Sequence, residues 1–477
     1  MNVAGVVTRL WKALQIPIAA ATAELAAIAI ATPLLLAVEF WNRFPIIYYD
    51  TGAYVLEGLG GRFVAERAPV YSLFLRFAGG GVSLWLVAAI QALLTAFVMT
   101  QTARQIAPRL SLIAFLALCV GLVGGTGISW YAGQIEPDCF AADLILVIYL
   151  LTFHGSTLGS VRRILLIALG AFAAAVHPSH LILAGALACA LVAVALLQRA
   201  LRLPLWSDPG HTLPRLGDLA LVATAALALV VAANFELTGQ VFVTRAGPSF
   251  VFARLLQDRI VIRLLDETCP NSAYRLCRYK DELPRTADGW LWTPESPFFA
   301  LGGFAGTADE SARIVRDSLE RYPWLHVRWA FADAARQFVL FRTGDQIEPQ
   351  QWAIGPSLRR YLPGQMQSYM AARQQKGAID FRAINRVHMP VAVIALTVLL
   401  LAIAVFVATG QWRRARAPVF VLVALAANAI ICGTFSGPHD RYQSRLLWTV
   451  PFLLVLVAAD RRTPPCGSLG NPAGSAP

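Results

Sequence analysis

Residues 390–409 read PVAVIALTVLLLAIAVFVAT, twenty positions without a charged side chain. A helix of this length rises about 30 Å, which matches the hydrocarbon core of a bilayer. Comparable apolar runs recur along the chain, in which 57% of the residues are hydrophobic and only 14% are charged. So many runs are difficult to bury inside a soluble protein. The sequence therefore predicts an all-α polytopic membrane protein.

We interpret about ten runs as transmembrane helices. Their expected bounds are 17–40, 82–102, 110–129, 139–154, 163–177, 179–198, 216–236, 390–409, 418–435 and 445–460. The pair at 163–198 is interrupted by His177, Pro178, Ser179 and His180. Two short helices would keep the loops alternating between the two sides of the membrane, whereas one long kinked helix would break that alternation.

Basic residues are clustered beside the ends of the apolar runs, which is typical of cytoplasmic loops. With an even number of spans, all of these loops fall on one side. The clusters are Arg9 with Lys12, Arg104 with Arg109, Arg162 with Arg163, Arg199 with Arg202 and Arg215, Arg413 with Arg414 and Arg416, and Arg461 with Arg462. This topology accounts for the net charge of +12 without nucleic-acid binding. We expect a multi-pass protein of a bacterial inner membrane with both termini cytoplasmic.

The spans divide the chain into four segments. Residues 1–236 form an N-terminal transmembrane core with an outer loop at 41–81, and residues 390–462 hold the C-terminal transmembrane helices. Residues 237–389 are much more polar and have no spanning run, so we expect a small, mainly helical periplasmic domain there. Residues 463–477 are rich in Pro, Gly and Ser and are expected to form a disordered cytoplasmic tail.

Two local signals lie in the polar segment. Cys269 and Cys277 are expected to form a disulfide, because an oxidising periplasm would close so short a loop. Zinc binding is the less favoured alternative, since no paired Cys or His ligands lie nearby at zinc spacing. Thr307 followed three residues later by Glu310 is typical of a capping box, which predicts Thr307 as the N-cap of a helix over 308–321.

The first outer loop places Asp50 directly after the aromatic pair of FPIIYYD, residues 44–50. A carboxylate at the membrane surface is costly to desolvate, so Asp50 is a candidate general base or metal ligand. Capping of the following helix is the alternative. Arg67 and Tyr71 come later in the loop. They could contact an anionic headgroup, or belong to a turn and an interfacial aromatic belt.

The second outer loop carries Glu136 and Asp138, which flank a proline at the start of the fourth span. Together with Asp50 they could form an acidic cluster that binds a divalent metal ion or shares acid and base roles. Asp138 also suits a helix N-cap. His177 and His180 could bind a phosphate or a metal, although a histidine pair in a turn is more often structural.

The last outer loop reads GPHDRYQSRLLW over residues 437–448. Arginines on the outer side run against the positive-inside trend, and phosphate recognition is a natural reason for them. An alternative is a surface ion pair with a second, snorkelling arginine. The candidate substrate-binding residues here are His439, Arg441, Tyr442 and Arg445.

These motifs share an arrangement: YYDTGAYV after the first span, RAPVYSLFLR before the second, PD at the fourth and GPHDRYQSRLLW before the last. The arrangement resembles the GT-C superfamily of membrane glycosyltransferases, such as the protein O-mannosyltransferase and aminoarabinose transferase groups. The resemblance covers mostly the first third and the last fifth of the chain. It implies transfer of a sugar from a polyprenyl-phosphate carrier to an envelope glycan, lipid or protein acceptor.

The resemblance also implies roles for single residues. Asp50 matches the acidic residue of the first outer loop, usually the catalytic base or an acceptor-orienting group. Asp138 takes the place of a second-loop acidic residue, which in some groups helps to bind a metal. Arg441 and Arg445 become candidates for the carrier phosphate. One departure is Thr51, which stands where the common double-acidic form has a second carboxylate.

Two other functions remain open at this level. A transporter or flippase of envelope lipid or glycan precursors would need a polar pathway with broken helices near the midplane. A noncatalytic polysaccharide-assembly protein would present an exposed apolar patch while its membrane cavity is closed. The glycosyltransferase interpretation instead predicts that Asp50, Asp138 and the turn at 441–445 converge on one outward cavity beside a lipid-accessible groove.

Overall fold

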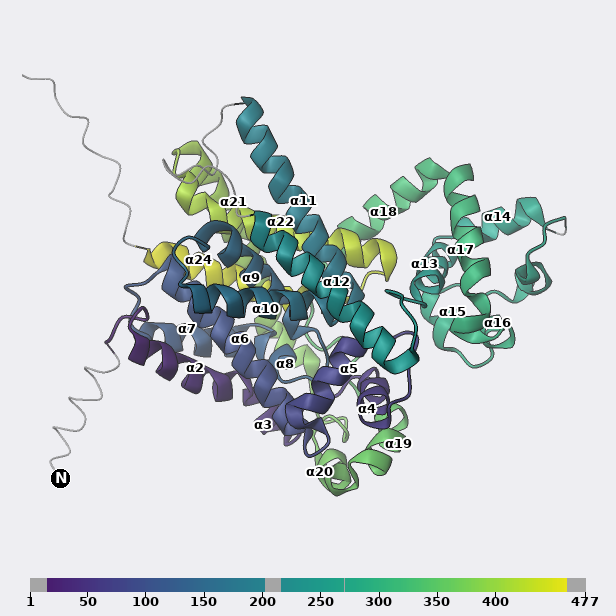
Figure 1. Ribbon diagram of the computed structural model, residues 1–477, viewed down its shortest axis with the longest axis horizontal. Helices are drawn as coiled ribbons and strands as arrows, with labels where there is room; N and C mark the ends of the chain where they lie inside the picture. Colours follow the sequence, from purple (N-terminus) through teal and green to yellow (C-terminus); the bar gives the residue numbers. More distant parts are fainter. Residues whose placement is uncertain (1–14, 202–215, 270, 461–477) are drawn as a thin grey trace, which may run out of the picture.

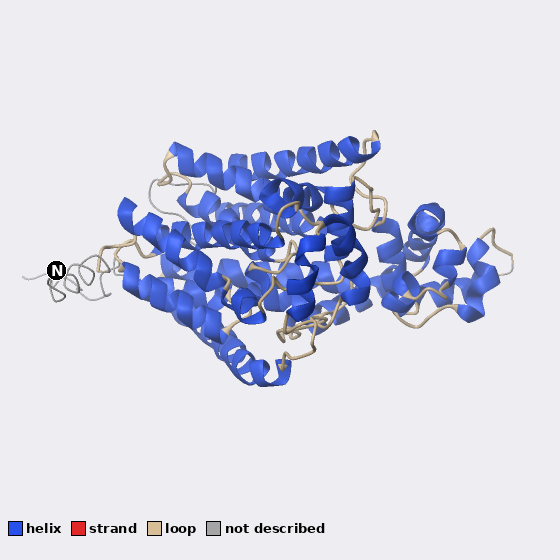
Figure 2. Ribbon diagram, turned by 90° about the horizontal axis from the view of Figure 1, so that it is seen from below, coloured by secondary structure: helices blue, strands red, loops and turns tan. Residues whose placement is uncertain are grey.

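The structure, a computed structural model, describes residues 15–201, 216–269 and 271–460. These residues form helices joined by loops, with one isolated antiparallel bridge between Pro17 and Ser111 (Figure 2). The expectation of an all-α protein is therefore confirmed for the described residues. The predicted tail at 463–477, and the basic residues Arg9, Lys12, Arg202, Arg215, Arg461 and Arg462, lie outside them.

Seven described helices are long and apolar enough to cross a membrane. They are α2 with α3 (Ala21–Leu35 and Ala37–Asn42), α6 (Leu84–Ile106), α11 (Pro178–Leu201), α12 (Leu216–Thr238), α21 (Phe381–Ala408), α22 (Trp412–Phe435), and α23 with α24 (Asp440–Leu447 and Thr449–Ala459). Two apolar helices are shorter, α7 (Leu112–Gly125) and α9 (Cys139–His154). The described helices therefore fit a membrane protein with seven candidate spans, whereas ten full-length spans are not confirmed.

The interrupted stretch at 163–198 folds as two helices. The first, α10 (Ser160–Ala175), ends before His177, and α11 begins at Pro178. Proline is tolerated in the first turn because the amides there have no partner within the helix. With Arg162 and Arg163 in its first turn, α10 packs between α9 and α12. The alternative of one long kinked helix is therefore wrong.

Residues 239–380, between α12 and α21, form a helical insertion. Its helices are α13 (Gly247–Gln257), α14 (Ile260–Thr268), η2 (Arg275–Glu282), α15 (Ala287–Trp292), α16 (Pro297–Ala300), α17 (Gly303–Arg321), α18 (Pro323–Phe338), α19 (Gln351–Tyr361), η3 (Pro363–Gln365) and α20 (Met366–Ala371). The elements from α13 to α17 share an apolar core that includes Phe252, Trp290 and Phe298. In Figure 1 they lie at one end of the molecule, while α19 and α20 lie apart from them, near α4.

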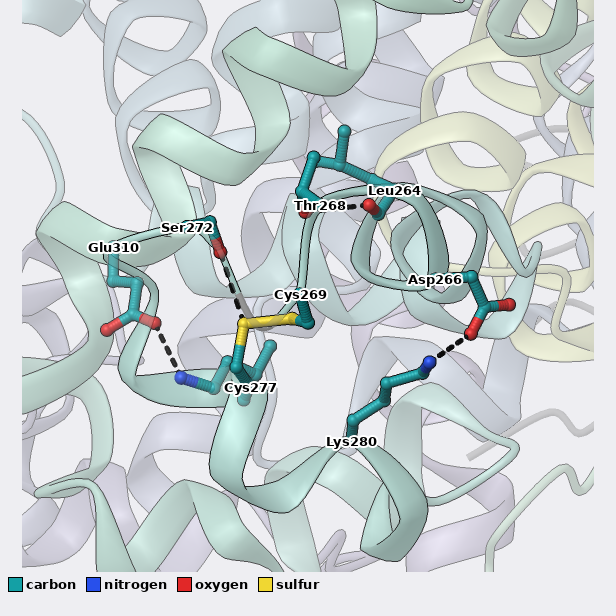
Figure 3. The surroundings of a disulfide bond; sticks show 9 residues. Leu264, Asp266, Thr268, Cys269, Ser272, Cys277, Lys280 and Glu310 are labelled. Atoms are coloured by element: carbon teal, nitrogen blue, oxygen red, sulfur yellow. Dashed lines mark hydrogen bonds and ion pairs between the residues drawn. A yellow bond between two sulfur atoms is a disulfide. The ribbon is translucent and has the colours of Figure 1, made fainter.

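The loop between α14 and η2 is closed by a disulfide between Cys269 and Cys277, with a Cα–Cα distance of 5.7 Å (Figure 3). Glu310 supports this loop by accepting from the Leu276 amide at 2.9 Å. The capping-box prediction is wrong, because α17 begins at Gly303 and Thr307 lies inside it. There the Thr307 hydroxyl donates to the Gly303 carbonyl at 2.8 Å. Glu310 is thus recruited by a distant loop rather than by a helix N-terminus.

Two glycines let the insertion approach the membrane helices closely. A Cβ at Gly433 in α22 would lie 2.7 Å from the Asp333 carbonyl oxygen of α18. A Cβ at Gly52 would lie 2.3 Å from the Ala353 carbonyl oxygen of α19. Gly52 belongs to α4 (Thr51–Gly60), the helix that follows Asp50 in the first loop. The insertion therefore packs backbone to backbone against the elements that carry the predicted site.

The remaining helices of the first loop are α5 (Pro69–Leu75) and the π-helical turn η1 (Arg76–Gly80), and the second loop holds the short α8 (Ile128–Ala132). Glu57 of α4 is fully buried between α4 and α5. Its carboxylate accepts from the Ser72 hydroxyl at 2.6 Å and from the Val64 amide at 3.0 Å. Glu57 thus fixes the shape of the loop that presents Asp50.

Candidate functional site

A cavity of about 450 Å³ lies where the first loop meets the ends of α11, α12 and α22 and the insertion. Its size suits a small organic ligand. Six of the predicted site residues line it: Asp50, Arg67, His177, His439, Arg441 and Tyr442. These side chains come from both ends of the sequence and from the middle. The fold brings Asp50 and Arg441 to one cavity, but Asp138 and Arg445, which were predicted to share it, are not in its lining.

Asp50 precedes α4 but directs its carboxylate to the guanidinium of Arg67, with which it forms an ion pair. The Arg67 guanidinium also lies over the Trp292 ring of the insertion, 5.7 Å from its centroid. Burial opposes the charged form of Arg67, but the neighbouring Asp50 carboxylate outweighs it and raises the pKa of Arg67. The structure therefore favours the ion-pair role of Asp50 over the capping alternative.

Asp138 lies behind the cavity wall, fully buried between two arginines. Arg445 Nη1 is 2.6 Å from Asp138 Oδ1, and Arg441 Nε is 3.1 Å from Asp138 Oδ2. Burial opposes ionisation of Asp138, but the two guanidinium groups outweigh it and lower its pKa. In this arrangement Asp138 and Arg445 do not touch a ligand in the cavity. They hold Arg441, whose side chain does line it.

Arg441 is also fixed from its other sides. Its guanidinium lies 4.1 Å from the centroid of the Tyr48 ring, a cation–π contact. Its backbone amide donates to Asp345 Oδ2 at 3.3 Å, and His439 Nδ1 lies 3.4 Å from the same oxygen. Burial opposes ionisation of Asp345, but His439 and Arg441 outweigh it and lower its pKa. Arg441 is thus a rigidly placed cation at the cavity surface.

Glu136 is fully buried beside this cluster. Its Oε1 accepts weakly from the Thr51 hydroxyl at 3.5 Å, and its Oε2 has no hydrogen-bond partner in the described chain. Burial, and then the charge of Asp50, raise the pKa of Glu136 well above its ordinary value. Its surroundings therefore favour the neutral form of the Glu136 carboxyl over the charged form.

The predicted metal set of Asp50, Glu136 and Asp138 is not arranged as one. Within the described residues, no group of three or more His, Cys, Asp or Glu side chains is placed to hold a metal ion. The physical reason is that Asp50 and Asp138 are each neutralised by arginine and Glu136 is desolvated. The metal site stays a prediction, while the described geometry pairs Asp50 and Asp138 with arginines.

Three further predicted residues differ in exposure to the cavity. His177 lines it, and its Nδ1 lies 2.7 Å from the Ser179 hydroxyl. Burial lowers the pKa of His177 well below its ordinary value, which keeps the ring neutral. His180 is fully buried and its Nδ1 lies 3.0 Å from the Ala173 carbonyl oxygen. The Tyr71 hydroxyl donates to Gln91 Oε1 at 2.7 Å, behind the cavity wall.

The sequence did not identify several cavity residues, including Tyr48, Tyr49, Arg245, Trp292 and Gln346. The aromatic pair Tyr48 and Tyr49 marks the position of Asp50 in the sequence, but nothing there indicates a ligand contact for the two rings. Gln346 and Trp292 lie in the insertion, which has no motif that points to a ligand. A signal was nevertheless present at Gly344, since a glycine within a polar stretch often marks a tight turn.

The described residues form a helical protein with seven candidate membrane spans and a partly open cavity lined by both charged and apolar side chains. Comparison of the chain with protein-family models, with curated proteins and with solved structures finds no match in any of the three. Any functional assignment must therefore rest on the chemistry of the cavity.

Proposed function

We propose that this protein is a glycosyltransferase of a bacterial inner membrane. It would move a sugar from a polyprenyl-phosphate carrier to an envelope glycan, lipid or protein acceptor on the periplasmic face. The observation that carries the proposal is the placement of Asp50 and Arg441 in the lining of one cavity. A carboxylate and a fixed cation are the two groups that such a transfer needs.

The chemistry assigns a role to each group. Asp50 takes the proton of an acceptor hydroxyl while the acceptor oxygen attacks the anomeric carbon of the sugar. The bond from that carbon to the phosphate oxygen breaks, and polyprenyl phosphate leaves with the electron pair. Arg441 stabilises the phosphate, and Arg67 holds and orients the Asp50 carboxylate. A divalent metal ion would have to replace Arg67 as the partner of Asp50.

The cavity also has a part suited to an isoprenoid chain. Ile182 of α11 and Phe435 of α22 line it and are 45% and 43% exposed, respectively. Both belong to candidate membrane-spanning helices, so lipid is a natural neighbour for their exposed apolar surface. Val230 of α12 and Ile431 of α22 extend the apolar lining. A lipid-linked substrate could therefore place its phosphate at Arg441 and its chain between these helices.

A noncatalytic assembly protein is the second candidate, because α18 carries an exposed apolar patch. Trp324, Val327 and Phe331 recur on one face of α18 and are 82%, 43% and 72% exposed. Such a patch favours contact with a partner protein. The open cavity argues against this candidate, which predicts a closed membrane region. A transporter is less favoured, since the intramembrane Asp143 pairs only with Thr95 at 3.0 Å among the described residues.

The test is a transfer assay on membranes with a panel of labelled polyprenyl-phosphate sugars, at matched expression. Asp50→Asn keeps the size of the side chain but removes the base, and should reduce transfer by at least about 100-fold. Asp309→Asn, an exposed position in α17, is the matched control and should transfer like the wild type. Unchanged transfer by Asp50→Asn would remove Asp50 from the chemistry. No transfer from any donor by the wild type would favour the assembly candidate.

A further inference from the structure

We propose that Gln346 is the residue that recognises the transferred sugar, with its side-chain amide donating to a sugar hydroxyl. This inference rests on the proposed function and adds to it a specificity-determining residue from the insertion. Gln346 lines the cavity and lies in the turn from Gly344 to Ile347. That turn is distant in sequence from every motif that suggested a site.

The turn holds Gln346 in an unusual backbone conformation. Gln346 has a φ of 58°, in the left-handed region that residues other than glycine rarely adopt. Gly344, with a φ of 99°, precedes it, and a Cβ there would lie 2.0 Å from the Phe381 ring. The Ile347 amide closes the turn onto the Gly344 carbonyl at 3.1 Å. Strain of this kind is found preferentially at functional sites.

Contacts on each side of the turn prevent it from relaxing. Before it, the Thr343 amide donates to Asn385 Oδ1 at 2.9 Å, and Asn385 Nδ2 donates back to the Thr343 carbonyl at 2.8 Å. Within it, Asp345 accepts from the Arg441 amide. After it, Ile347 is buried in a small apolar cluster with Trp130. The backbone at Gln346 is thus fixed with respect to Arg441.

The side chain of Gln346 is oriented by the aromatic pair before Asp50. The hydroxyls of Tyr48 and Tyr49 both donate to Gln346 Oε1. Both acceptor positions of that oxygen are therefore used. The amide nitrogen, Nε2, has no hydrogen-bond partner within the described residues. It is not fully buried, so a ligand in the cavity can reach it. Only its two N–H groups remain to meet a ligand, and a sugar hydroxyl oxygen is an acceptor for them.

Tyr48 links this amide to the phosphate-binding group. The face of its ring carries the Arg441 guanidinium at 4.1 Å, while its hydroxyl is bound to Gln346. A single rigid side chain therefore sets the spacing between a cation and a pair of amide donors. A sugar phosphate presents an anionic group next to a set of hydroxyls. The anionic group would meet Arg441, and a hydroxyl would meet the Gln346 amide.

The experiment measures binding to the purified full-length protein in lipid nanodiscs. The probes are a polyprenyl monophosphate without sugar and the same carrier bearing each of a panel of hexoses and pentoses. We expect the wild type to prefer one sugar-bearing probe over the bare carrier. Gln346→Met keeps the length of the side chain but removes both donors. It should reduce that preference about tenfold, the effect of one lost hydrogen bond, with affinity for the bare carrier unchanged.

Two further variants make the result specific. Gln367→Met, at an exposed glutamine of α20, should bind like the wild type. Tyr49→Phe removes one of the two hydroxyls that orient the amide and should reduce the preference in the same direction but less. An equal loss on all probes would make Gln346 structural, and a retained preference would exclude it from recognition. In both cases the proposed function would stand. No preference in the wild type would overturn the role of Gln346, while the transfer assay with Asp50→Asn decides the proposed function separately.

Discussion

Arg445 donates from Nη1 to Asp138 Oδ1 at 2.6 Å, and neither side chain has any solvent-exposed surface. The two residues are 307 positions apart in the chain. The pair joins the start of α9 to α23, and Arg441 completes it from the cavity side. The geometry of the cavity therefore depends on a charge that never faces it.

Removal of Asp138 is expected to destabilise the whole protein rather than only its chemistry. Asp138→Ala would leave two buried guanidinium groups without an anion, which costs about 3–5 kcal/mol in comparable cases. Thermal unfolding of the detergent-solubilised protein measures this. Glu295→Gln, at an exposed position, is the control and should unfold like the wild type. A shift no larger than that of the control would mean that the two arginines find other partners.

The stability of the insertion is expected to fall as pH rises. Burial raises the pKa of Asp258 from 3.8 to about 7, although Arg254 opposes the shift and Asp333 adds to it. Between these two pKa values the folded state holds a proton that the unfolded state has released. The contribution of Asp258 to the free energy of unfolding is therefore complete below about pH 4 and is lost as the pH rises to about 7. The slope is on the order of 1 kcal/mol per pH unit.

Amide exchange in α13 and α14, expressed as protection factors, measures this slope. Asp258→Asn cannot titrate and should give protection that is nearly independent of pH over the same range. Protection that increases with pH in the wild type would show that Asp258 is ionised in the folded state.

Loss of the disulfide is expected to loosen the α14–η2 end of the insertion. Cys269 and Cys277 are separated by 8 positions, and closing so short a loop stabilises the folded state by about 2.5 kcal/mol in the chain-entropy model. The variant with both cysteines changed to serine should be cleaved faster by protease in this loop. Protease resistance equal to that of the wild type would mean that the Glu310 hydrogen bond is sufficient to hold the loop.

A larger side chain at the contact between α18 and α22 is expected to displace the insertion. Gly433→Ala places a methyl group 2.7 Å from the Asp333 carbonyl oxygen, and such overpacking typically costs about 1–3 kcal/mol. A labelled pair of cysteines across the two helices would report the increase in distance. Gly121→Ala is the matched control, because no atom lies within 4 Å of its added Cβ. An unchanged distance would show that the backbone of α18 is not held by this contact.

The sequence predicts the helical membrane class well, because apolar runs such as 390–409 can be recognised from their composition alone. It also places Asp50 and Arg441 on the same side of the membrane, since loop position follows from the order of the spans. The arginine partners of Asp138 are not predictable in this way. Asp138 could bind a metal ion from solvent or pair with an arginine of the protein. The arginine that pairs with it, Arg445, is 307 positions away in the chain, so no local sequence pattern predicts the pairing.

Local motifs also give incomplete information where a distant segment competes for the same group. The Thr307–Glu310 spacing fits a capping box, but Glu310 binds the Leu276 amide and the Arg275 side chain, each at 2.9 Å. Gln346 carries no motif, and only the fold places it against Tyr48. The pairing of Cys269 with Cys277, 8 positions apart, is therefore predictable, whereas that of Asp138 with Arg445, 307 positions apart, is not.

The pairing of Asp138 with the last helices has a consequence for biosynthesis. During translation, the second outer loop enters the membrane long before Arg441 and Arg445 have been made. Until they arrive, Asp138 must remain hydrated or protonated, because burying an unpaired carboxylate is prohibitively costly. The cavity therefore cannot be completed on a partial chain. Completion of the cavity is therefore coupled to the arrival of the final helix pair, and a chain that lacks this pair would leave Asp138 without its two arginine partners.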